Sequence, residues 1–339
     1  MDAISVIIPF FQREPGILTR ALTSLMSQHI PDGWSVEVIV VDDASPCPAH
    51  DEVRGLHFPE PLNIKLIRQD NAGVAAARNR GLDEVDQAAT LIAFLDSDDI
   101  WPANHLARAI QAINEGFDFY FTDNCREGHH ESHCHSPYCA ETAAFLDTSP
   151  HKKGFLEIPT DYMIGLTLRE FPCQASTVVY RRIINKALHF DTALIYSGED
   201  VLFFIQLVAS AHRVCIDLDS IVKCGGGVNI YFSNLSWSSE RFLPITVDKA
   251  VLHRLIAERL DLSPSNRQWN EEVLAESRRE LAFQMLRNLL KNPARTLREI
   301  SRLLRMAPGA AIVLPIDMIF VALSQVIRSS RGKPEERRA

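Results

Sequence analysis

The sequence predicts an α/β protein with a mostly parallel, twisted sheet flanked by helices and a C-terminal helical extension. Short β-branched runs alternate with helical patterns through residues 1–122, which is typical of a parallel sheet covered on both faces. From residue 248 to 304 the apolar positions recur at helical spacing instead. The 339 residues suffice for one large domain, placed at 1–235, and an appendage at 236–339.

The first part of the domain contains the strands and helices with the clearest patterns. Strands are expected at residues 4–8, 36–41, 64–67, 91–95 and 117–122. Helices are expected at 17–26, 72–82 and 103–114. Because the carboxyl ends of parallel strands lie on one edge of a sheet, the polar loops behind them should converge there. These loops are residues 9–14, 42–43, 71–73 and 96–99.

The second part of the domain is less regular. Residues 125–160 show few periodic positions and look irregular. Beyond them the pattern predicts helices at 162–168, 182–188 and 201–211 and a strand at 175–180. The residues after 248 form a helical tail, with Arg and Glu between the apolar positions.

The net charge of −8 hides an asymmetry between the body and the tail. From Glu276 onward, 13 Lys/Arg stand against 6 Asp/Glu, a net +7, which leaves −15 for the rest. The acidic body argues against nucleic-acid binding, whereas the basic tail suggests contact with an anionic surface such as phospholipid headgroups. The 7 cysteines are an odd number and no signal peptide precedes the first strand, so we expect a reducing, cytoplasmic setting.

The most informative stretch is the fourth predicted strand and the carboxylates behind it, Asp96, Asp98 and Asp99. Carboxylates this close repel one another, and a bound cation relieves the repulsion. The alternative is a strand end in which Asp98 or Asp99 caps a helix near Pro102. No G-x-G-x-x-G follows a strand and no G-x-x-x-x-G-K is present, and we interpret the glycines at 225–227 as a loop. A nucleotide diphosphate would therefore need a metal ion.

Four motifs together resemble the family 2 glycosyltransferases, which are inverting enzymes of the GT-A fold that use nucleotide-diphosphate sugars. The motifs are SVIIPFF at 5–11, VIVVDDAS at 38–45, NAGVAAARNRG at 71–81 and FLDSDD at 94–99. They occur in the family's order over about residues 4–122. A looser likeness extends to Tyr231 through the sequences SGED at 197–200 and GVNI at 227–230.

The resemblance implies a donor site in residues 1–122 and an acceptor half in 123–235. Asp42 would accept a hydrogen bond from the base, most simply from the imide N–H of uracil, with a turn cap as the alternative. Arg78 would face the nucleotide or its phosphates, with a solvated surface arginine as the alternative, and Arg80 is expected to be exposed. The residues assigned to the donor are Pro9, Phe11 and Glu14 around the nucleoside, then Asp42, Asn71, Gly73, Arg78, Asp96 and Ser97.

The resemblance also implies a metal site and a catalytic base. Asp98 would bind Mn²⁺ or Mg²⁺ directly, and Asp96 would contact the ribose or the metal through water. Asp200 would take the proton from the attacking hydroxyl, and Glu199 would position the acceptor. A base of this kind contributes about 10²- to 10⁴-fold. The alternative is a helix start, because Ser197 and Asp200 have capping-box spacing.

Two features fall outside the resemblance. Residues 125–139 contain three cysteines and four histidines, for which a structural zinc and a mobile, acceptor-facing loop are the two hypotheses. Residues 307–327 are apolar apart from Asp317, Ser324 and Gln325, so 302–331 either contact a membrane peripherally or pack on the domain. The N-L-S sequence at 234–236 matches a glycosylation acceptor, which a cytoplasmic chain would not use.

The sequence thus predicts a metal-dependent inverting glycosyltransferase of the hexosyltransferase class. It would move a sugar from a nucleotide diphosphate, most simply UDP, onto a hydroxyl of a glycan or lipid-linked acceptor in bacterial surface polysaccharide biosynthesis. A nucleotidyltransferase is one alternative, although its basic first loop is represented only by Arg13. A non-catalytic nucleotide-sugar-binding module is the other, and the presence of both Asp98 and Asp200 argues against it. The donor sugar, the acceptor and the linkage depend on loop shapes that pattern does not define.

Overall fold

The computed structural model of the chain describes residues 2–128, 131–149, 153–226 and 239–330. The chain forms two compact units. The first comprises Met1–Thr192 and Glu199–Ile230, and the second comprises Ala193–Gly198 and Tyr231–Ala339. The short segment Ala193–Gly198 therefore belongs to the second unit, although the chain before and after it belongs to the first.

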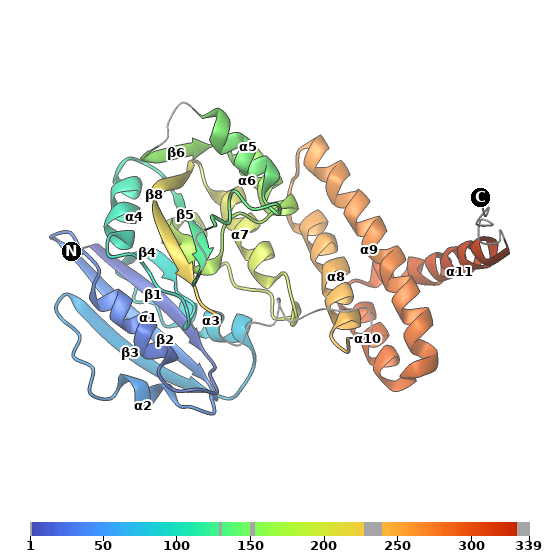
Figure 1. Cartoon of the computed structure of the whole chain (residues 1–339), viewed down its shortest axis with the longest axis horizontal. Helices are drawn as coiled ribbons and strands as arrows, with labels where there is room; N and C mark the ends of the chain where they lie inside the picture. The colour runs from blue at the N-terminus through green and yellow to red at the C-terminus, as the bar shows by residue number, and fades with distance from the viewer. Residues whose placement is uncertain (1, 129–130, 150–152, 227–238, 331–339) are drawn as a thin grey trace, which may run out of the picture. The chain divides into compact units, whose positions relative to one another are not determined.

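The first unit is built on a mixed sheet that has eight strands in the described residues (Figure 1). The strands are β1 (Asp2–Phe10), β2 (Trp34–Asp43), β3 (Leu62–Gln69), β4 (Ala89–Phe94), β5 (Phe119–Arg126), β6 (Phe155–Ile158), β7 (Val178–Arg181) and β8 (Val214–Cys224). Their order is β3-β2-β1-β4-β7-β5-β8-β6. Parallel pairing joins β3, β2, β1 and β4 in turn and also β5 with β8, whereas β7 and β6 run antiparallel to their neighbours. The predicted α/β fold is confirmed.

Helices cover both faces of this sheet. They are α1 (Ile17–Met26), α2 (Ala49–Val53), α3 (Val74–Asp83), α4 (His105–Asn114), α5 (Ala140–Thr148), α6 (Thr160–Arg169) and α7 (Glu199–Ser210). One face of β1, which includes Val6, shares a buried apolar cluster with Leu22 of α1 and Ile110 of α4. On the other face α3 lies close to β1, because a Cβ atom at Gly81 would come within 2.4 Å of Ile7. Apolar residues on both faces of β1 explain why its sequence is an unbroken apolar run.

The second half of the first unit differs in part from the prediction. The expected helix at 182–188 is only a 3-10 turn, Arg182–Ile184, because the backbone becomes extended at Asn185. The expected strand at 175–180 starts later, at Val178, after another 3-10 turn. Residues 125–160, which looked irregular, contain α5 and β6. Strand β8 was not predicted, because Asp217 and Asp219 interrupt its apolar run.

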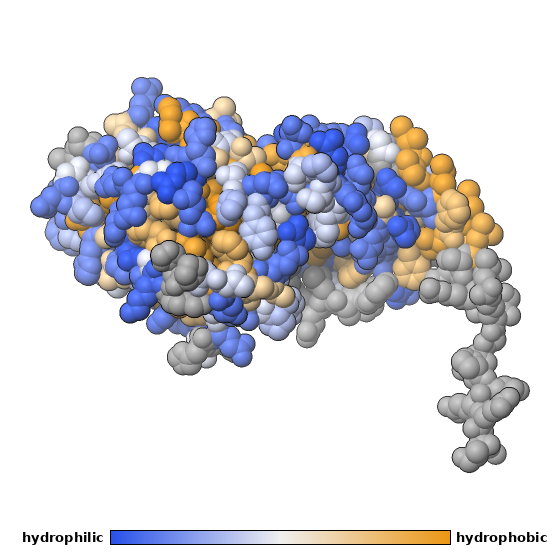
Figure 2. Space-filling model, turned by 90° about the horizontal axis from the view of Figure 1, so that it is seen from above, coloured by the Kyte–Doolittle hydropathy of each residue, from blue (hydrophilic) through white to orange (hydrophobic). Residues whose placement is uncertain are grey.

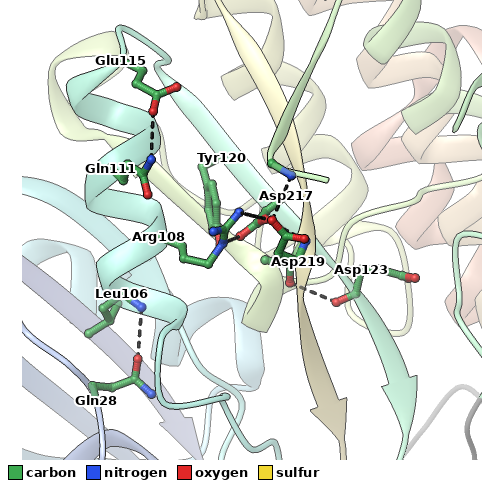
Figure 3. A network of polar contacts seen from close by, with 11 residues as sticks. Gln28, Leu106, Arg108, Gln111, Glu115, Tyr120, Asp123, Asp217 and Asp219 are labelled. Carbon is green, nitrogen blue, oxygen red and sulfur yellow. Dashed lines mark hydrogen bonds and ion pairs between the residues drawn. The ribbon is translucent and has the colours of Figure 1, made fainter. Parts of the chain in front are cut away.

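Those two aspartates belong to an ion-pair network around Arg108 (Figure 3). Asp217 is fully buried and accepts hydrogen bonds from Nε and Nη2 of Arg108 in α4. It also accepts one from the Tyr120 hydroxyl of β5 at 2.9 Å. Asp219 accepts hydrogen bonds from Arg108 Nη2 at 3.2 Å and from the Gly154 N–H at 2.9 Å. One arginine thus connects α4, β8 and the residue that precedes β6.

The second unit is helical in its described residues beyond Gly198, as predicted for the C-terminal extension (Figure 1). Its helices are α8 (Phe242–Arg259), α9 (Pro264–Lys291), α10 (Pro293–Met306) and α11 (Pro308–Ser330). Three of them begin with a proline, whose missing N–H has no helical partner at that position anyway. In the described chain, no helix combines the length and apolar character needed to span a lipid bilayer.

Candidate functional site

Polar loops follow β1, β2, β3 and β4 at the same edge of the sheet. The parallel register places Phe10 beside Asp42 and Asp42 beside Arg68, and it places Ile7 of β1 beside Phe94 of β4. All four strands therefore end together, and their loops form the candidate site, as is usual for parallel α/β sheets.

The end of β1 and the loop after it contain three residues that were assigned to the nucleoside pocket. Pro9 is buried, Phe11 is half-buried and Glu14 is exposed. Phe11 therefore offers an apolar side chain, and Glu14 a charged one, to a ligand at this edge of the sheet. The contacts of all three with a nucleoside stay a prediction.

Gln12, which sequence reasoning missed, connects three of the loops. Its backbone N–H donates to Ser45 Oγ at 2.7 Å, and the Ser45 hydroxyl donates back to the Gln12 carbonyl at 2.8 Å. The Gln12 side-chain amide donates to Ser97 Oγ at 3.1 Å. Both Gln12 and Ser45 are buried. These bonds therefore fix the loops after β1 and β2 against the loop at residues 96–99, called the acidic loop below. The signal in the sequence that could have found Gln12 was its place in a polar loop behind a predicted strand.

Asp42, at the end of β2, is almost fully buried. Its oxygens accept the backbone N–H groups of Ser45 at 2.7 Å and Ala49 at 3.0 Å, and Arg68 Nη1 lies at 3.5 Å. These contacts fit the turn-cap alternative. The contact of Asp42 with a nucleotide base stays a prediction, for which Oδ1 still has a second lone pair, whereas Oδ2 accepts from both Ala49 and Arg68.

Asp43 shapes the loop that leads into α3, a role that the sequence analysis did not assign. It accepts hydrogen bonds from the N–H groups of Ala72 and Gly73, each at 2.8 Å. Asn71 is exposed and its side-chain amide donates to the Asp43 carbonyl at 3.0 Å. Gly73 has a φ of +90°, which a residue with a side chain rarely adopts. This conformation accounts for the glycine directly before α3.

Arg78 is buried, so the surface-arginine alternative is wrong. Its guanidinium donates from Nη2 to Asp96 at 2.8 Å and lies with Nη1 3.4 Å from Glu199, over the ring of Phe190 at 5.2 Å. Burial alone would lower the pKa of Arg78, but Asp96 and Glu199 raise it above the ordinary value. Arg78 thereby joins the acidic loop to the predicted catalytic pair, Glu199 and Asp200. Arg80, by contrast, is exposed and pairs with Glu84 at 2.6 Å.

The acidic loop holds three carboxylates in different environments. Asp96 is one-third exposed at its side chain, with 36% accessible, Asp98 is half-buried and Asp99 is buried. Burial and the charges of Asp96 and Asp98 raise the pKa of Asp99 to about 8. Helix α4 starts at His105 with Asn104 in the N-cap position, so neither Asp98 nor Asp99 caps it and that alternative is wrong.

Gly225 contacts this loop closely, which the sequence interpretation as a plain loop did not foresee. Its N–H donates to Asp99 Oδ1 at 2.9 Å. A Cβ atom on Gly225 would lie only 2.2 Å from the Asp98 carbonyl oxygen. Only glycine fits here, and the end of β8 thereby supports the acidic loop.

Glu199 and Asp200 form the first turn of α7. Burial and the neighbouring Asp200 raise the pKa of Glu199 to about 7, although Arg78 opposes the shift. Burial likewise raises the pKa of Asp200, and Asp200 Oδ1 accepts the N–H of Val201 at 2.8 Å. A carboxylate with a raised pKa is a better proton acceptor than an exposed one, which suits a general base.

The acidic loop has the chemistry of a site for a hard cation. Its donors are all oxygens, and the pKa of Asp99 is raised by burial and also by the charges of Asp96 and Asp98, a repulsion that a divalent ion would relieve. Within the described residues no three His, Cys, Asp or Glu side chains are arranged to hold a metal ion. Asp96 and Asp98 would therefore hold an ion only together with other oxygens, such as those of a diphosphate.

The cysteine and histidine cluster shows no zinc site in the part of the chain that the structure describes. His129 and His130 lie outside the described residues, as do 227–230 and the N-L-S sequence at 234–236. Cys139 Sγ lies 3.5 Å from His133 Nε2, but no third ligand joins this pair among the described side chains. All seven cysteines are free thiols in the structure.

Comparisons with known proteins agree with this geometry. The model of the family described as Glycosyl transferase family 2 matches residues 5–165. The succinoglycan biosynthesis protein ExoW of Rhizobium meliloti (strain 1021) is 36% identical over 239 residues, 69% of this chain and 72% of ExoW. The UDP-Glc:alpha-D-GlcNAc-diphosphoundecaprenol beta-1,3-glucosyltransferase WfgD of Escherichia coli is 37% identical over 111 residues, 32% of this chain and 40% of WfgD.

A solved structure shares the fold. The crystal structure of S. aureus TarS 1–349 in complex with UDP has a TM-score of 0.58 and 20% identity, over 96% of this chain and 91% of that chain. This likeness confirms the predicted GT-A-type α/β fold with C-terminal helices. The family match and the likeness to ExoW show that the chain belongs to glycosyl transferase family 2.

Proposed function

We propose that this family 2 member is a metal-dependent inverting glycosyltransferase that uses a nucleotide-diphosphate sugar, and that the nucleotide is UDP. One observation carries the proposal: buried Arg78 contacts both Asp96 of the acidic loop and Glu199 of the catalytic pair. A donor held at the acidic loop would therefore lie next to Asp200. The name of WfgD states a UDP-sugar donor, which supports UDP here.

The residues divide the transfer between donor binding and proton removal. Asp98 and Asp96 would hold Mg²⁺ or Mn²⁺, which when bound would neutralise charge on the leaving diphosphate. Asp200 would accept the proton of the acceptor hydroxyl while its oxygen bonds to the anomeric carbon and the bond from that carbon to the diphosphate breaks. Glu199 would orient the acceptor. A single displacement of this kind inverts the configuration of the anomeric carbon.

The acceptor we propose is a hydroxyl of a glycan or lipid-linked glycan in bacterial surface polysaccharide biosynthesis. ExoW is named for succinoglycan biosynthesis, and the name of WfgD states an acceptor linked to diphosphoundecaprenol. A lipid-linked acceptor would lie at the inner face of the cytoplasmic membrane. Peripheral contact with that membrane is therefore part of the proposal.

Helix α11 has an apolar face that suits such contact. Figure 2 shows hydrophobic residues gathered over α11, and five of its apolar side chains are more than half exposed. They recur at helical spacing and are Ile312, Ile316, Ile319, Phe320 and Leu323. Asp317 does not interrupt this face, because it is mostly buried and pairs with Arg278 of α9 at 3.4 Å. Arg302 is mostly buried too, which leaves exposed Arg305 as the basic flank on this side.

Two assays test the proposal. Nucleotide release from UDP-, GDP- and dTDP-sugars, with and without Mn²⁺, should show one UDP-sugar consumed only with metal, and the anomeric proton of the product should report inversion. Release from no donor would favour a non-catalytic binding module, and pyrophosphate exchange with a nucleoside triphosphate would favour a nucleotidyltransferase. Removal of residues 306–339 should release the protein from anionic vesicles, and unchanged binding would refute the membrane contact.

A further inference from the structure

The residues directly before the catalytic pair are held by the second unit. Ala193–Gly198 belongs to that unit, and Glu199 and Asp200 follow it in the chain without a gap. Any constraint on the backbone at residue 198 is therefore passed on to the start of α7. The question is which side chains impose such a constraint.

Asp248 of α8 is the first of them. It is fully buried and accepts hydrogen bonds from the backbone N–H groups of Tyr196 at 2.6 Å and Ser197 at 3.1 Å. A buried carboxylate needs hydrogen-bond donors or a cation, and here two successive backbone amides are its donors. The bonds fix the backbone two and three residues before Glu199.

Arg302 of α10 completes the arrangement. Its guanidinium pairs with Asp248, and Nη2 donates to the Ala193 carbonyl at 3.3 Å. The same group lies over the ring of Tyr196, 5.6 Å from the ring centre, and bonds to Glu299 at 3.0 Å. Arg302 therefore neutralises Asp248 and holds the other end of the same segment. A solvated basic side chain at a membrane surface would show none of these contacts.

Gly198 closes the segment in a conformation that glycine favours. Its φ is +90°, and a Cβ atom there would lie 2.9 Å from Leu252 Cδ2 of α8. The absence of a side chain thus lets the backbone turn closely against α8 just before Glu199.

We propose that Asp248 and Arg302 are positioning residues for the catalytic pair: they fix the backbone of residues 193–197, from which the chain continues through Gly198 directly into Glu199 and Asp200. The inference rests on the proposed roles of Glu199 and Asp200. A general base must lie within hydrogen-bond reach of its proton, and a misplacement of about 1 Å can lower the rate about 10²-fold. These two side chains would therefore contribute to turnover.

The test combines amide exchange with kinetics on the full chain. Asp248→Asn keeps the shape of the side chain but removes its charge. The double change Asp248→Asn with Arg302→Gln removes both charges, so neither member of the pair is left as a buried charge without the other. It keeps the test open if the single variant fails to fold. The double change Arg254→Gln with Glu258→Gln is the matched control, since it removes an exposed ion pair on α8. Arg302→Lys is the conservative variant, because it keeps a cation beside Asp248.

We expect faster exchange at the amides of Tyr196 and Ser197 in Asp248→Asn and in the double variant that also carries Arg302→Gln. Their kcat should fall about 10- to 100-fold with an unchanged KM for the donor. The control should match the native chain, and Arg302→Lys should retain most of the turnover. Faster exchange with native kcat would mean a merely structural role and overturn the inference, as would unchanged exchange. Absence of turnover in the native chain would instead overturn the proposed function, and the exchange rates would still decide whether Asp248 holds the segment.

Discussion

Arg108 and Arg78 of the first unit each contact two carboxylates from other parts of the chain, and they differ in how completely their hydrogen bonds are satisfied. Arg108 donates to Asp217, whose oxygens also accept the Tyr120 hydroxyl and the Asp219 N–H. Arg78 contacts Asp96 and Glu199, but its Nε has no hydrogen-bond partner among the residues that the structure describes. The first network is complete, whereas the second is not.

We interpret the Arg108 network as structural and the Arg78 cluster as part of the proposed site. A polar network whose members are all bonded stabilises a fold, whereas spare hydrogen-bonding capacity leaves groups available to a ligand. Around Arg78 the pKa of Glu199 is raised to about 7, and Asp96 remains 36% exposed at its side chain. The proposed sugar donor and acceptor would therefore bond to groups whose hydrogen-bonding capacity the protein alone does not use. Variants that break each network should separate activity from stability.

The largest effect is expected at Asp98. Two unit charges about 4 Å apart interact by roughly 4 kcal/mol at an intermediate dielectric, so loss of the metal contact should lower turnover by about 10³-fold. We expect Asp98→Asn and chelation by EDTA to act alike, with Mn²⁺ restoring only the chelated native chain. Donor turnover at saturating metal is the measurement. Asp219→Asn, which removes a carboxylate from the Arg108 network, should keep native turnover, and equal losses in both variants would break the comparison.

Arg108→Met should act on stability instead. It leaves Asp217 buried without its cation, which typically costs about 3–5 kcal/mol of unfolding free energy. Urea unfolding should show this loss, while turnover per folded molecule stays native. Arg78→Met is the counterpart. Because Asp96 is partly exposed, this variant should lose mainly turnover, and a larger stability loss at Arg78 than at Arg108 would contradict the distinction.

A smaller, pH-dependent effect is expected at His105. This ring is fully buried and stacks on Trp101 with 4.4 Å between the ring centres, and neither ring nitrogen has a hydrogen-bond partner in the described part of the chain. Burial lowers the pKa of His105 to about 3. The unfolded chain therefore binds a proton as the pH falls below about 6.5, while the folded chain stays neutral. Folding should lose about 2 kcal/mol at pH 5 relative to pH 8 from this residue alone.

His105→Phe tests that expectation. The variant should lose less stability than the native chain between pH 8 and pH 5, as measured by urea unfolding at both values. An identical pH dependence in the two proteins would show that His105 gains a proton without cost in the folded state. The result bears on the comparison of the two arginine networks. His105 is a buried side chain without a hydrogen-bond partner among the described residues, yet it has no proposed role in catalysis.

The sequence predicted the parts of this molecule that depend on local pattern. The apolar runs of β1, β2 and β4 and the carboxylates behind them are visible without a structure, because burial on both faces requires such runs. The burial of Arg78 is not visible, since it depends on carboxylates 18 and 121 residues away in the chain. The close contact of Gly225 with Asp98 likewise needs the register of β8, whose aspartates conceal the strand.

The account depends most on Asp200. Burial raises the pKa of this carboxyl, so turnover should decline on the acid side at a pH above the ordinary aspartate value. The decisive measurement is donor affinity and kcat of Asp200→Asn on one protein sample. The account predicts native affinity for the UDP-sugar and a kcat lower by about 10²- to 10⁴-fold. Native kcat in Asp200→Asn would contradict it.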